Sequence, residues 1–134
     1  MILVDTDVLV DCLRGTDAAK QWIERASSEA LAIPGVAAME LVIGCRHQAH
    51  LQQIQKFLGT FSVTWPDAAD SARAYELLLT HRLTSGLGIP DCLIAAMALN
   101  RKALLCTFNS KHFGVIAGLD VQQPYTRPHQ PSAS

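Results

Sequence analysis

Acidic side chains stand at several points of this sequence where they have no basic neighbour. Asp5 and Asp7 follow directly on the apolar residues 2–4, and Glu40 and Asp91 lie within apolar segments. A carboxylate on an apolar helix face has a large desolvation cost unless a positive charge meets it. Carboxylates brought together by the fold repel one another by energies on the order of kcal/mol, and a divalent cation removes that repulsion. Oxygen ligands of this kind are typical of Mg²⁺ or Mn²⁺ sites.

The elements that must position these side chains alternate along the chain. A short continuous apolar run such as residues 2–4 is typical of a strand buried on both faces. We predict further strands at 31–33, 61–65, 103–107 and 119–121. We predict helices at 7–14, 17–27, 36–45, 47–58, 67–84 and 90–101, with a turn or short helix at 110–113. This alternation indicates an α/β fold, with a central parallel sheet of about four to five strands and helices on both faces.

The predicted topology brings five of the polar side chains to one edge of the sheet. In an open parallel sheet, ligands bind in the crevice at the carboxyl ends of the strands. Asp5 and Asp7 follow the first strand at that edge. Glu40 and Asp91 lie in the first turns of two helices, and Asn109 follows the strand at 103–107. We therefore expect these five residues to lie together.

Three other acidic residues lead to different expectations. Asp120 precedes its strand, so it is excluded from this edge. Asp67 and Asp70 also begin a helix after a strand, and topology alone does not exclude them. Arg73 follows Asp70 by one helical turn, which favours a solvated surface position for Asp70.

The composition limits the classes of protein that this chain can represent. A length of 134 residues suits one domain, and 49% apolar with 17% charged residues excludes disorder as the main state. No apolar run is long enough to span a membrane and no secretion signal is visible, so we expect a soluble cytoplasmic protein without a membrane partner. The net charge is −1; without Asp5, Asp7, Glu40 and Asp91 the chain has 11 basic and eight acidic residues. A mildly basic surface around an acidic site is compatible with a polyanion held by metal.

The cysteines and histidines suggest no competing chemistry. The four cysteines lie in apolar stretches without the spacing of a zinc knuckle or a redox pair, and we expect reduced core thiols at Cys12, Cys45, Cys92 and Cys106. His47 and His50 have a zinc-like spacing but lack further clustered ligands, which favours a solvated helix face. The sequence shows no set of residues for nucleophilic catalysis by Ser or Cys.

Four segments carry a resemblance that covers nearly the whole chain. They are Ile-Leu-Val-Asp-Thr-Asp-Val-Leu at 2–9, Glu-Leu-x-x-Gly at 40–44, Pro-Asp-x-x-Ile-Ala-Ala at 90–96, and Thr-Phe-Asn-Ser-Lys-His-Phe at 107–113. In order and spacing they resemble the motifs of PIN-domain ribonucleases, most closely the VapC toxins of type II toxin–antitoxin pairs. The resemblance implies a PIN-like nuclease domain over 1–123. We expect residues 124–134, which include three prolines, to form a loose tail.

The resemblance also assigns roles to residues. Asp5, Glu40 and Asp91 match the three core acids of a metal-dependent endoribonuclease. Asp5 and Asp91 are expected to bind Mg²⁺ or Mn²⁺ directly, and Glu40 to be a ligand or to orient the attacking water. Asn109 stands where many members have a fourth acid, so it offers a carbonyl oxygen without charge.

Further residues are expected to support the site or to bind RNA. Asp7 stands where the family usually has Asn, and Thr6 and Thr107 are candidates for hydroxyl groups that hold the acids. The basic or imidazole side chains nearest to the motifs are candidates for RNA contacts: Arg14, Arg46, Lys111 and His112.

The resemblance implies two protein partners. One is a small antitoxin that covers the acidic edge, with a basic side chain placed among the core acids. The other is a second copy of the chain, because the family implies homodimers and an isologous dimer is the commonest closed assembly.

Two other functions are compatible with some of the residues. A PIN domain that binds RNA or protein without cleavage would fit the missing fourth acid at position 109. A haloacid-dehalogenase-like phosphatase would use Asp5 as nucleophile and Asp7 as acid or base, and Lys111 could serve as its lysine. That class also needs a late acidic pair, and none follows residue 91.

Overall fold

A five-stranded parallel sheet forms the centre of the molecule. The computed structural model describes residues 1–26 and 30–127. The strands are β1 (Ile2–Val4), β2 (Leu31–Pro34), β3 (Ser62–Thr64), β4 (Leu104–Cys106) and β5 (Val121–Gln122), in the order β3-β2-β1-β4-β5. All four strand pairings are parallel. The predicted parallel α/β sheet of four to five strands is thereby confirmed.

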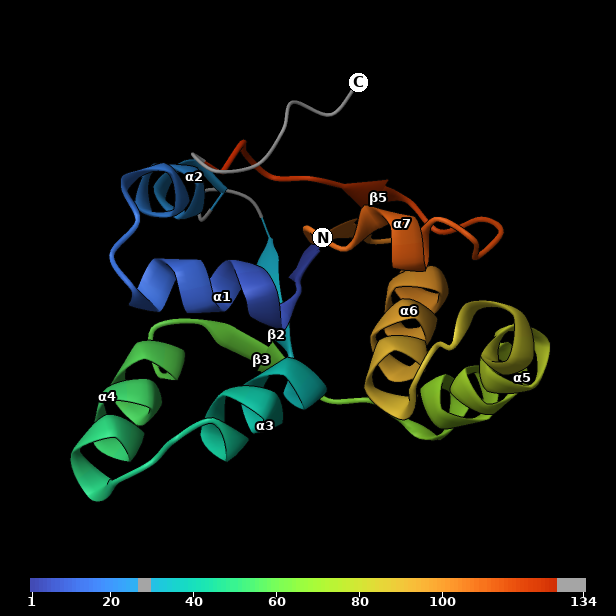
Figure 1. The fold of residues 1–134 in the computed structure, drawn as a ribbon, viewed down its shortest axis with the longest axis horizontal. Helices are drawn as coiled ribbons and strands as arrows, with labels where there is room; N and C mark the ends of the chain where they lie inside the picture. Colours follow the sequence, from blue (N-terminus) through green and yellow to red (C-terminus); the bar gives the residue numbers. More distant parts are fainter. Residues whose placement is uncertain (27–29, 128–134) are drawn as a thin grey trace.

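Helices cover both faces of this sheet. They are α1 (Thr6–Leu13), α2 (Asp17–Ala26), α3 (Gly35–Ile43), α4 (Gln48–Leu58), α5 (Ala68–Ser85), α6 (Ile89–Arg101) and α7 (Ser110–Phe113). Figure 1 shows α1 to α4 on one side of the strands and α5 to α7 on the other. This arrangement follows from the strand order, because right-handed crossovers place helices on opposite faces when the chain reverses direction across the sheet.

The core has two halves, one on each face of the sheet. Side chains alternate between the faces along a strand. Leu3 and Leu105 pack with α5, α6 and α7, whereas Val4 and Ile33 pack with α1, α3 and α4. The three central strands β1, β2 and β4 are therefore largely buried on both faces, as their continuous apolar sequence predicts, whereas the edge strands β3 and β5 are more exposed.

The outer face of α5 differs from the expectation. The apolar spacing suggests that Tyr75 and Leu79 point inward, but both are well exposed, and the buried residues of this helix are Asp70 and Ala74. Helix α5 packs chiefly against α6 rather than against the sheet, so only a narrow stripe of it is covered. The last strand also begins two residues later than predicted, at Val121.

Two further observations concern sequence expectations. Cys12, Cys92 and Cys106 are free and buried as expected, and Cys45 is free and half-buried. In the part of the chain that the structure describes, no helix has the length and apolar character needed to cross a membrane. The expected end of the second helix at residue 27 lies outside the described residues.

Candidate active site

Asp5 lies at the carboxyl end of β1 and caps the N-terminus of α1. Its Oδ1 accepts a hydrogen bond from the Thr6 backbone N–H at 2.8 Å, and its Oδ2 accepts one from the Thr107 hydroxyl at 2.7 Å. A capping carboxylate is a usual feature of a helix start. Asp5 is also buried, and this burial raises its pKa, with a further contribution from the charge of Asp91. The side chain is thus fixed in place while its charge is poorly compensated.

Glu40 reaches the same edge from the middle of α3. Its Oε1 accepts a hydrogen bond from the Thr6 hydroxyl at 3.0 Å, although the two residues are 34 positions apart. Burial raises the pKa of Glu40, and the charges of Asp5 and Asp91 raise it further. These mutual effects show that the carboxylates of β1, α3 and α6 are electrostatic neighbours, as their positions after the strands predict.

Asp91 belongs to the first turn of α6, where it is partly exposed. Its Oδ2 lies 3.4 Å from Nδ1 of His112, which is an ion pair only when the imidazole is protonated. The same Nδ1 lies 3.0 Å from the amide nitrogen of Asn109. Asn109 is exposed, and its backbone N–H donates to the Thr107 hydroxyl oxygen at 3.0 Å. The start of α6 and the loop before α7 are therefore linked through His112.

Asp7 connects α1 to the segment after β4. Its Oδ2 accepts a hydrogen bond from the Phe108 backbone N–H at 3.0 Å, and the Thr107 hydroxyl lies 3.4 Å away. Its Oδ1 is buried without a hydrogen-bond partner among the described residues. Burial and the charge of Asp5 raise the pKa of Asp7 to about 6. An unsatisfied buried carboxylate oxygen is costly to the fold, which makes this edge a candidate for binding a cation or another ligand.

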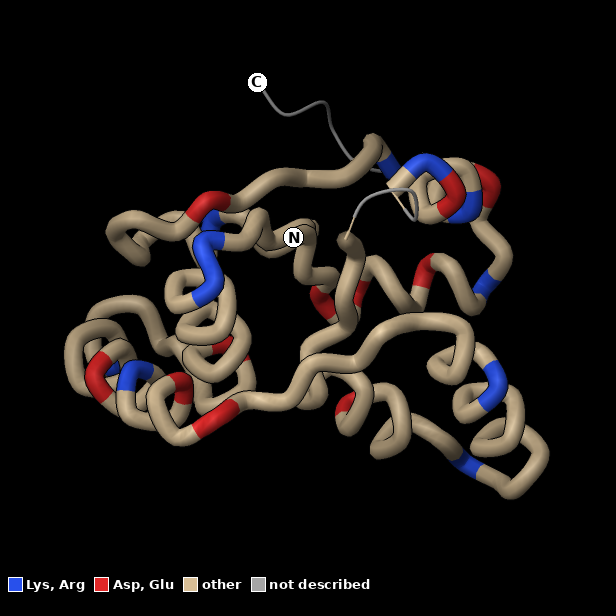
Figure 2. The backbone as a smooth tube through the Cα atoms, turned by 180° about the vertical axis from the view of Figure 1, so that it is seen from behind, with Lys and Arg blue, Asp and Glu red and all other residues tan. Residues whose placement is uncertain are grey.

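In the described part of the chain, the three acids expected to hold the metal have no ammonium or guanidinium partner. Within residues 1–26 and 30–127, no Lys or Arg forms an ion pair with Asp5, Glu40 or Asp91. Figure 2 shows acidic backbone segments near the centre of the molecule, while the basic segments lie toward its two sides. In the same described residues, no three acidic, His or Cys side chains are close enough to enclose a cation as they stand. These carboxylates nevertheless suit a hard divalent cation as ligands, because they offer oxygen atoms and because a cation would relieve the repulsion between their negative charges.

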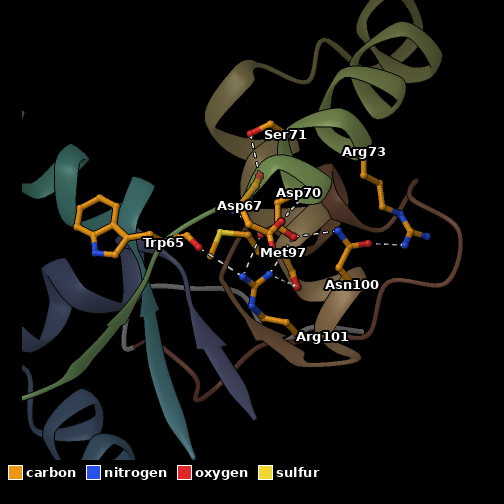
Figure 3. Close-up of polar contacts among 8 residues, drawn as sticks. All are labelled: Trp65, Asp67, Asp70, Ser71, Arg73, Met97, Asn100 and Arg101. Carbon is orange, nitrogen blue, oxygen red and sulfur yellow. Dashed lines mark hydrogen bonds and ion pairs between the residues drawn. The ribbon is translucent and has the colours of Figure 1, made fainter.

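Asp70 behaves differently from these acids, and the expectation that it is solvated was wrong. It is fully buried, and Figure 3 shows it surrounded by donors. Asn100 and Arg101 each donate to Oδ1 at 2.9 Å, and the Asp67 backbone N–H donates to Oδ2 at 2.9 Å. Burial alone would raise the pKa of Asp70, but these bonds and the Arg101 guanidinium outweigh it and lower the pKa to about 2. Arg73, the expected neighbour, instead binds Asn100 at 2.7 Å.

The predicted RNA contacts lie in three places. Arg14 is at the C-terminal end of α1 and lines a cavity together with Thr6 and Glu40. Lys111 and His112 line a separate surface depression together with Asn109. Arg46 is exposed in the segment between α3 and α4, and no described contact joins it to the acidic edge.

One set of contacts beside the site was not foreseen from the sequence. The Tyr125 hydroxyl and the Arg127 Nε donate to the same Oδ2 of Asp11, at 2.8 and 2.9 Å. The Arg127 guanidinium also lies 3.8 Å from the centre of the Phe108 ring. The expected loose tail therefore does not extend to Tyr125 and Arg127, and residues 128–134 lie outside the described part. No local pattern in the sequence pointed to these contacts, because Arg14 follows Asp11 by one helical turn and suggests an ordinary surface pair.

Comparisons with known proteins agree with this geometry. The model of the PIN domain family matches residues 2–119. Ribonuclease VapC10 of Mycobacterium tuberculosis is 35% identical over 136 residues, which cover 99% of this chain and 100% of that protein. The structure of a toxin–antitoxin complex from Klebsiella pneumoniae contains a chain that is 31% identical, with a TM-score of 0.75 over 93% of this chain and 98% of that one. VapBC2 of Rickettsia felis bound to promoter DNA shares the fold, with a TM-score of 0.79 at 24% identity over 91% of this chain and 98% of that one. The chain belongs to the PIN-domain family and, within it, to the VapC ribonucleases.

Proposed function

We propose that this protein is a metal-dependent endoribonuclease toxin that hydrolyses phosphodiester bonds in RNA. The observation that carries the proposal is the meeting of Asp5, Glu40 and Asp91 at one edge of the sheet without a Lys or Arg partner among the described residues. Membership in the VapC ribonucleases supports the same conclusion. It also argues against the phosphatase alternative, which belongs to a different family.

In this proposal each acid has a defined role. Asp5 and Asp91 bind a Mg²⁺ or Mn²⁺ ion, and Glu40 is a further ligand or orients the attacking water. A bound divalent ion supplies a more acidic water and neutralises charge on the phosphate. Thr107 and Thr6 hold the carboxylates of Asp5 and Glu40 by hydrogen bonds, so that little reorganisation is needed when substrate binds.

The residues around these acids complete the site. Asp7 keeps the segment after β4 against α1 through the Phe108 N–H, and it adds negative charge close to Asp5. Asn109 offers a carbonyl oxygen at the place of a fourth acid, and His112 lies between it and Asp91. Arg14, Arg46 and Lys111 are exposed cations that can bind the phosphates of an RNA strand.

A small antitoxin is the partner that this site implies. Several solved structures that resemble this chain are toxin–antitoxin complexes. A guanidinium placed among Asp5, Glu40 and Asp91 would replace the charge of the metal and form short charge-assisted hydrogen bonds. Coexpression with such an antitoxin is expected to prevent the growth arrest that the protein alone causes.

We also propose that the protein acts in the cytoplasm as a homodimer. Tyr75, Leu79 and Leu83 form an exposed apolar strip on α5, and Leu83 is 98% exposed. An apolar strip of this kind is typical of a surface that pairs with a copy of itself. Analytical ultracentrifugation is expected to show a dimer, and Leu83→Asp is expected to shift it toward monomer.

The decisive experiment is cleavage of a labelled RNA by the purified protein. We expect internal cuts with Mn²⁺ or Mg²⁺, and none after chelation with EDTA. The alternative function, binding without cleavage, is favoured only by the amide at Asn109. Binding of RNA with no metal-dependent cleavage under any of these conditions would establish that alternative and refute the endoribonuclease.

A further inference from the structure

A cavity of about 390 Å³ opens beside the proposed active site, between α1, α3 and α4. Thr6 and Glu40 form one part of its wall, and Arg14 forms another. Thr6 is the first residue of α1 and Arg14 follows its last, eight positions later, so they are about 12 Å apart along the helix. The cavity therefore runs along α1 from the acidic edge to a basic end.

The walls between these two ends combine apolar side chains with two polar groups. Leu41 of α3 and Ile54 of α4 are buried and give the apolar part. His50 and Gln53 also line the cavity, and they share one face of α4 because they are three positions apart. An amide side chain such as Gln53 can donate and accept a hydrogen bond at the same time.

The position of His50 is fixed by its neighbour. The His50 backbone N–H donates to Nδ1 of His47, which caps α4, at 3.1 Å. The two rings also lie against each other, with centroids 5.8 Å apart. The spacing of these histidines, which resembles a zinc motif in the sequence, thus serves a helix cap and leaves the His50 ring at the cavity.

Arg14 is a free cation. Within the described residues its guanidinium forms no hydrogen bond and no ion pair, and the side chain is exposed. It does not pair with Glu40, although both line the same cavity. The cavity consequently has a carboxylate at one end and an uncompensated positive charge at the other.

We propose that this cavity is a nucleoside subsite that helps to select the RNA sequence. The base of a nucleotide next to the cleaved bond lies against Leu41 and Ile54, Gln53 binds the edge of that base, and Arg14 binds the following phosphate. Unpaired bases of RNA are commonly recognised by hydrogen bonds to their edges and by contacts with their faces, and here aliphatic side chains take the place of the usual aromatic ring. The inference rests on the proposed endoribonuclease function and gives it a substrate feature.

The charges at the two ends favour a nucleotide over a protein side chain. A nucleotide unit within a strand has a phosphate on each side. The phosphate at the acidic end is compatible with metal-bound carboxylates, and the phosphate at the far end with Arg14. A basic antitoxin side chain that extended along the cavity would suit Glu40 but would meet the positive charge of Arg14.

The test uses single-stranded RNAs that carry the cleavage site and vary one base at a time. We expect Gln53→Ala to reduce discrimination at a single position by about tenfold, with similar rates for the disfavoured bases. We expect Arg14→Ala to raise KM about fivefold for every sequence and to leave kcat nearly unchanged. The plot of the logarithm of the binding constant against the logarithm of the salt concentration should become less steep by about 0.7. Matched controls are Gln52→Ala and Lys56→Ala, because both residues are exposed on α4 and neither lines the cavity.

Equilibrium binding of the same RNAs separates the two proposals. If the parent binds RNA with a preference that Gln53→Ala removes, but cuts nothing, the subsite stands and the endoribonuclease is wrong. If the parent cuts RNA and Gln53→Ala keeps the parental preference, as Gln52→Ala is expected to do, the subsite is wrong. Variants that lose only antitoxin binding would assign the cavity to the inhibitor, and the subsite would again be refuted.

Discussion

Two acidic centres of this protein have opposite electrostatics. Asp70 accepts four hydrogen bonds or ion-pair contacts from Asn100, Arg101 and the backbone of Asp67, and its pKa falls to about 2. Among the described residues, Asp5 and Glu40 have hydroxyl or backbone donors but no cation, and their pKa values are raised. Both kinds of centre join elements that are far apart in the chain. The comparison teaches that a buried acid stabilises the fold when a cation of the same chain compensates its charge. When no such cation is present, the acid indicates a site where a ligand can compensate the charge.

Removing the cation that compensates Asp70 is expected to have the largest effect on stability. Arg101→Met leaves the Asp70 carboxylate buried with only two other donors, so the free energy of unfolding should fall by about 3 kcal/mol. Urea unfolding at pH 7 measures the loss. Arg73→Ala is the control, because within residues 1–26 and 30–127 the side chain of this exposed residue hydrogen-bonds to Asn100 alone, and its effect should stay below about 1 kcal/mol.

The pH dependence of the same variant gives an independent check. Because the folded pKa of Asp70 is lower than the unfolded value, Asp70 stabilises the parent above about pH 4, and this contribution is lost as the pH falls toward 2. Arg101→Met should therefore approach the parental stability in acid. Equal differences at pH 7 and pH 2.5 would show that Arg101 acts through packing alone.

Removing charge from the unmatched centre should affect activity more than stability. Asp91→Asn is expected to reduce RNA cleavage at least a hundredfold, equivalent to about 2.7 kcal/mol in activation free energy. The melting temperature should hardly change, since the Asp91 side chain is partly exposed and its one polar contact with a described side chain is to His112. Normal cleavage by Asp91→Asn would remove this residue from the active site.

Breaking the contact of Arg127 with Asp11 should reduce the free energy of unfolding by less than breaking the Asp70–Arg101 pair. It is a matched pair like Asp70 with Arg101, but its side chains are more exposed, so Arg127→Ala should cost about 1–2 kcal/mol in unfolding free energy. Tyr125→Phe removes one hydrogen bond to the same carboxylate and should cost about 1 kcal/mol. An unchanged free energy of unfolding in both variants would show that the segment after β5 does not stabilise α1.

The smallest expected effect on stability is an increase, at Asp5. Because the pKa of Asp5 is raised in the folded state, its charge destabilises the metal-free protein at neutral pH. Asp5→Asn should therefore raise the melting temperature in EDTA by a few degrees at pH 7 while it abolishes most cleavage. The gain should vanish below about pH 4, where the carboxyl group is protonated in the folded and unfolded states.

Mn²⁺ provides the control for this last variant. It should raise the melting temperature of the parent by mass action and that of Asp5→Asn much less. A lower melting temperature of metal-free Asp5→Asn would identify Asp5 as a purely structural helix cap.

Features that depend on local patterns were predictable from the sequence. The run at 2–4 predicts a buried strand, and the position of Asp5 after it predicts a place at the carboxyl edge. Glu40 and Asp91 are found there for the same topological reason, and Thr6 and Thr107 lie where support was expected. The catalytic role of these residues stays a prediction.

Features that depend on distant contacts were not predictable. Asp70 was assigned to Arg73, three positions away, but its true partner Arg101 is 31 positions away and cannot be found by helical spacing. The bond from Tyr125 to Asp11 joins residues 114 positions apart. Tyr75 is exposed because α5 stands off the sheet, which an apolar pattern alone does not reveal.

The bonds from Arg127 to Asp11 and to the backbone oxygen of Asp7 tie a late part of the chain to the first helix. All five strands and all the acids of the proposed site precede Arg127 in the chain. A proteolytic cut between β5 and Arg127 would therefore leave every strand and every acid on one fragment. It would separate from that fragment only the restraint that Arg127 places on α1.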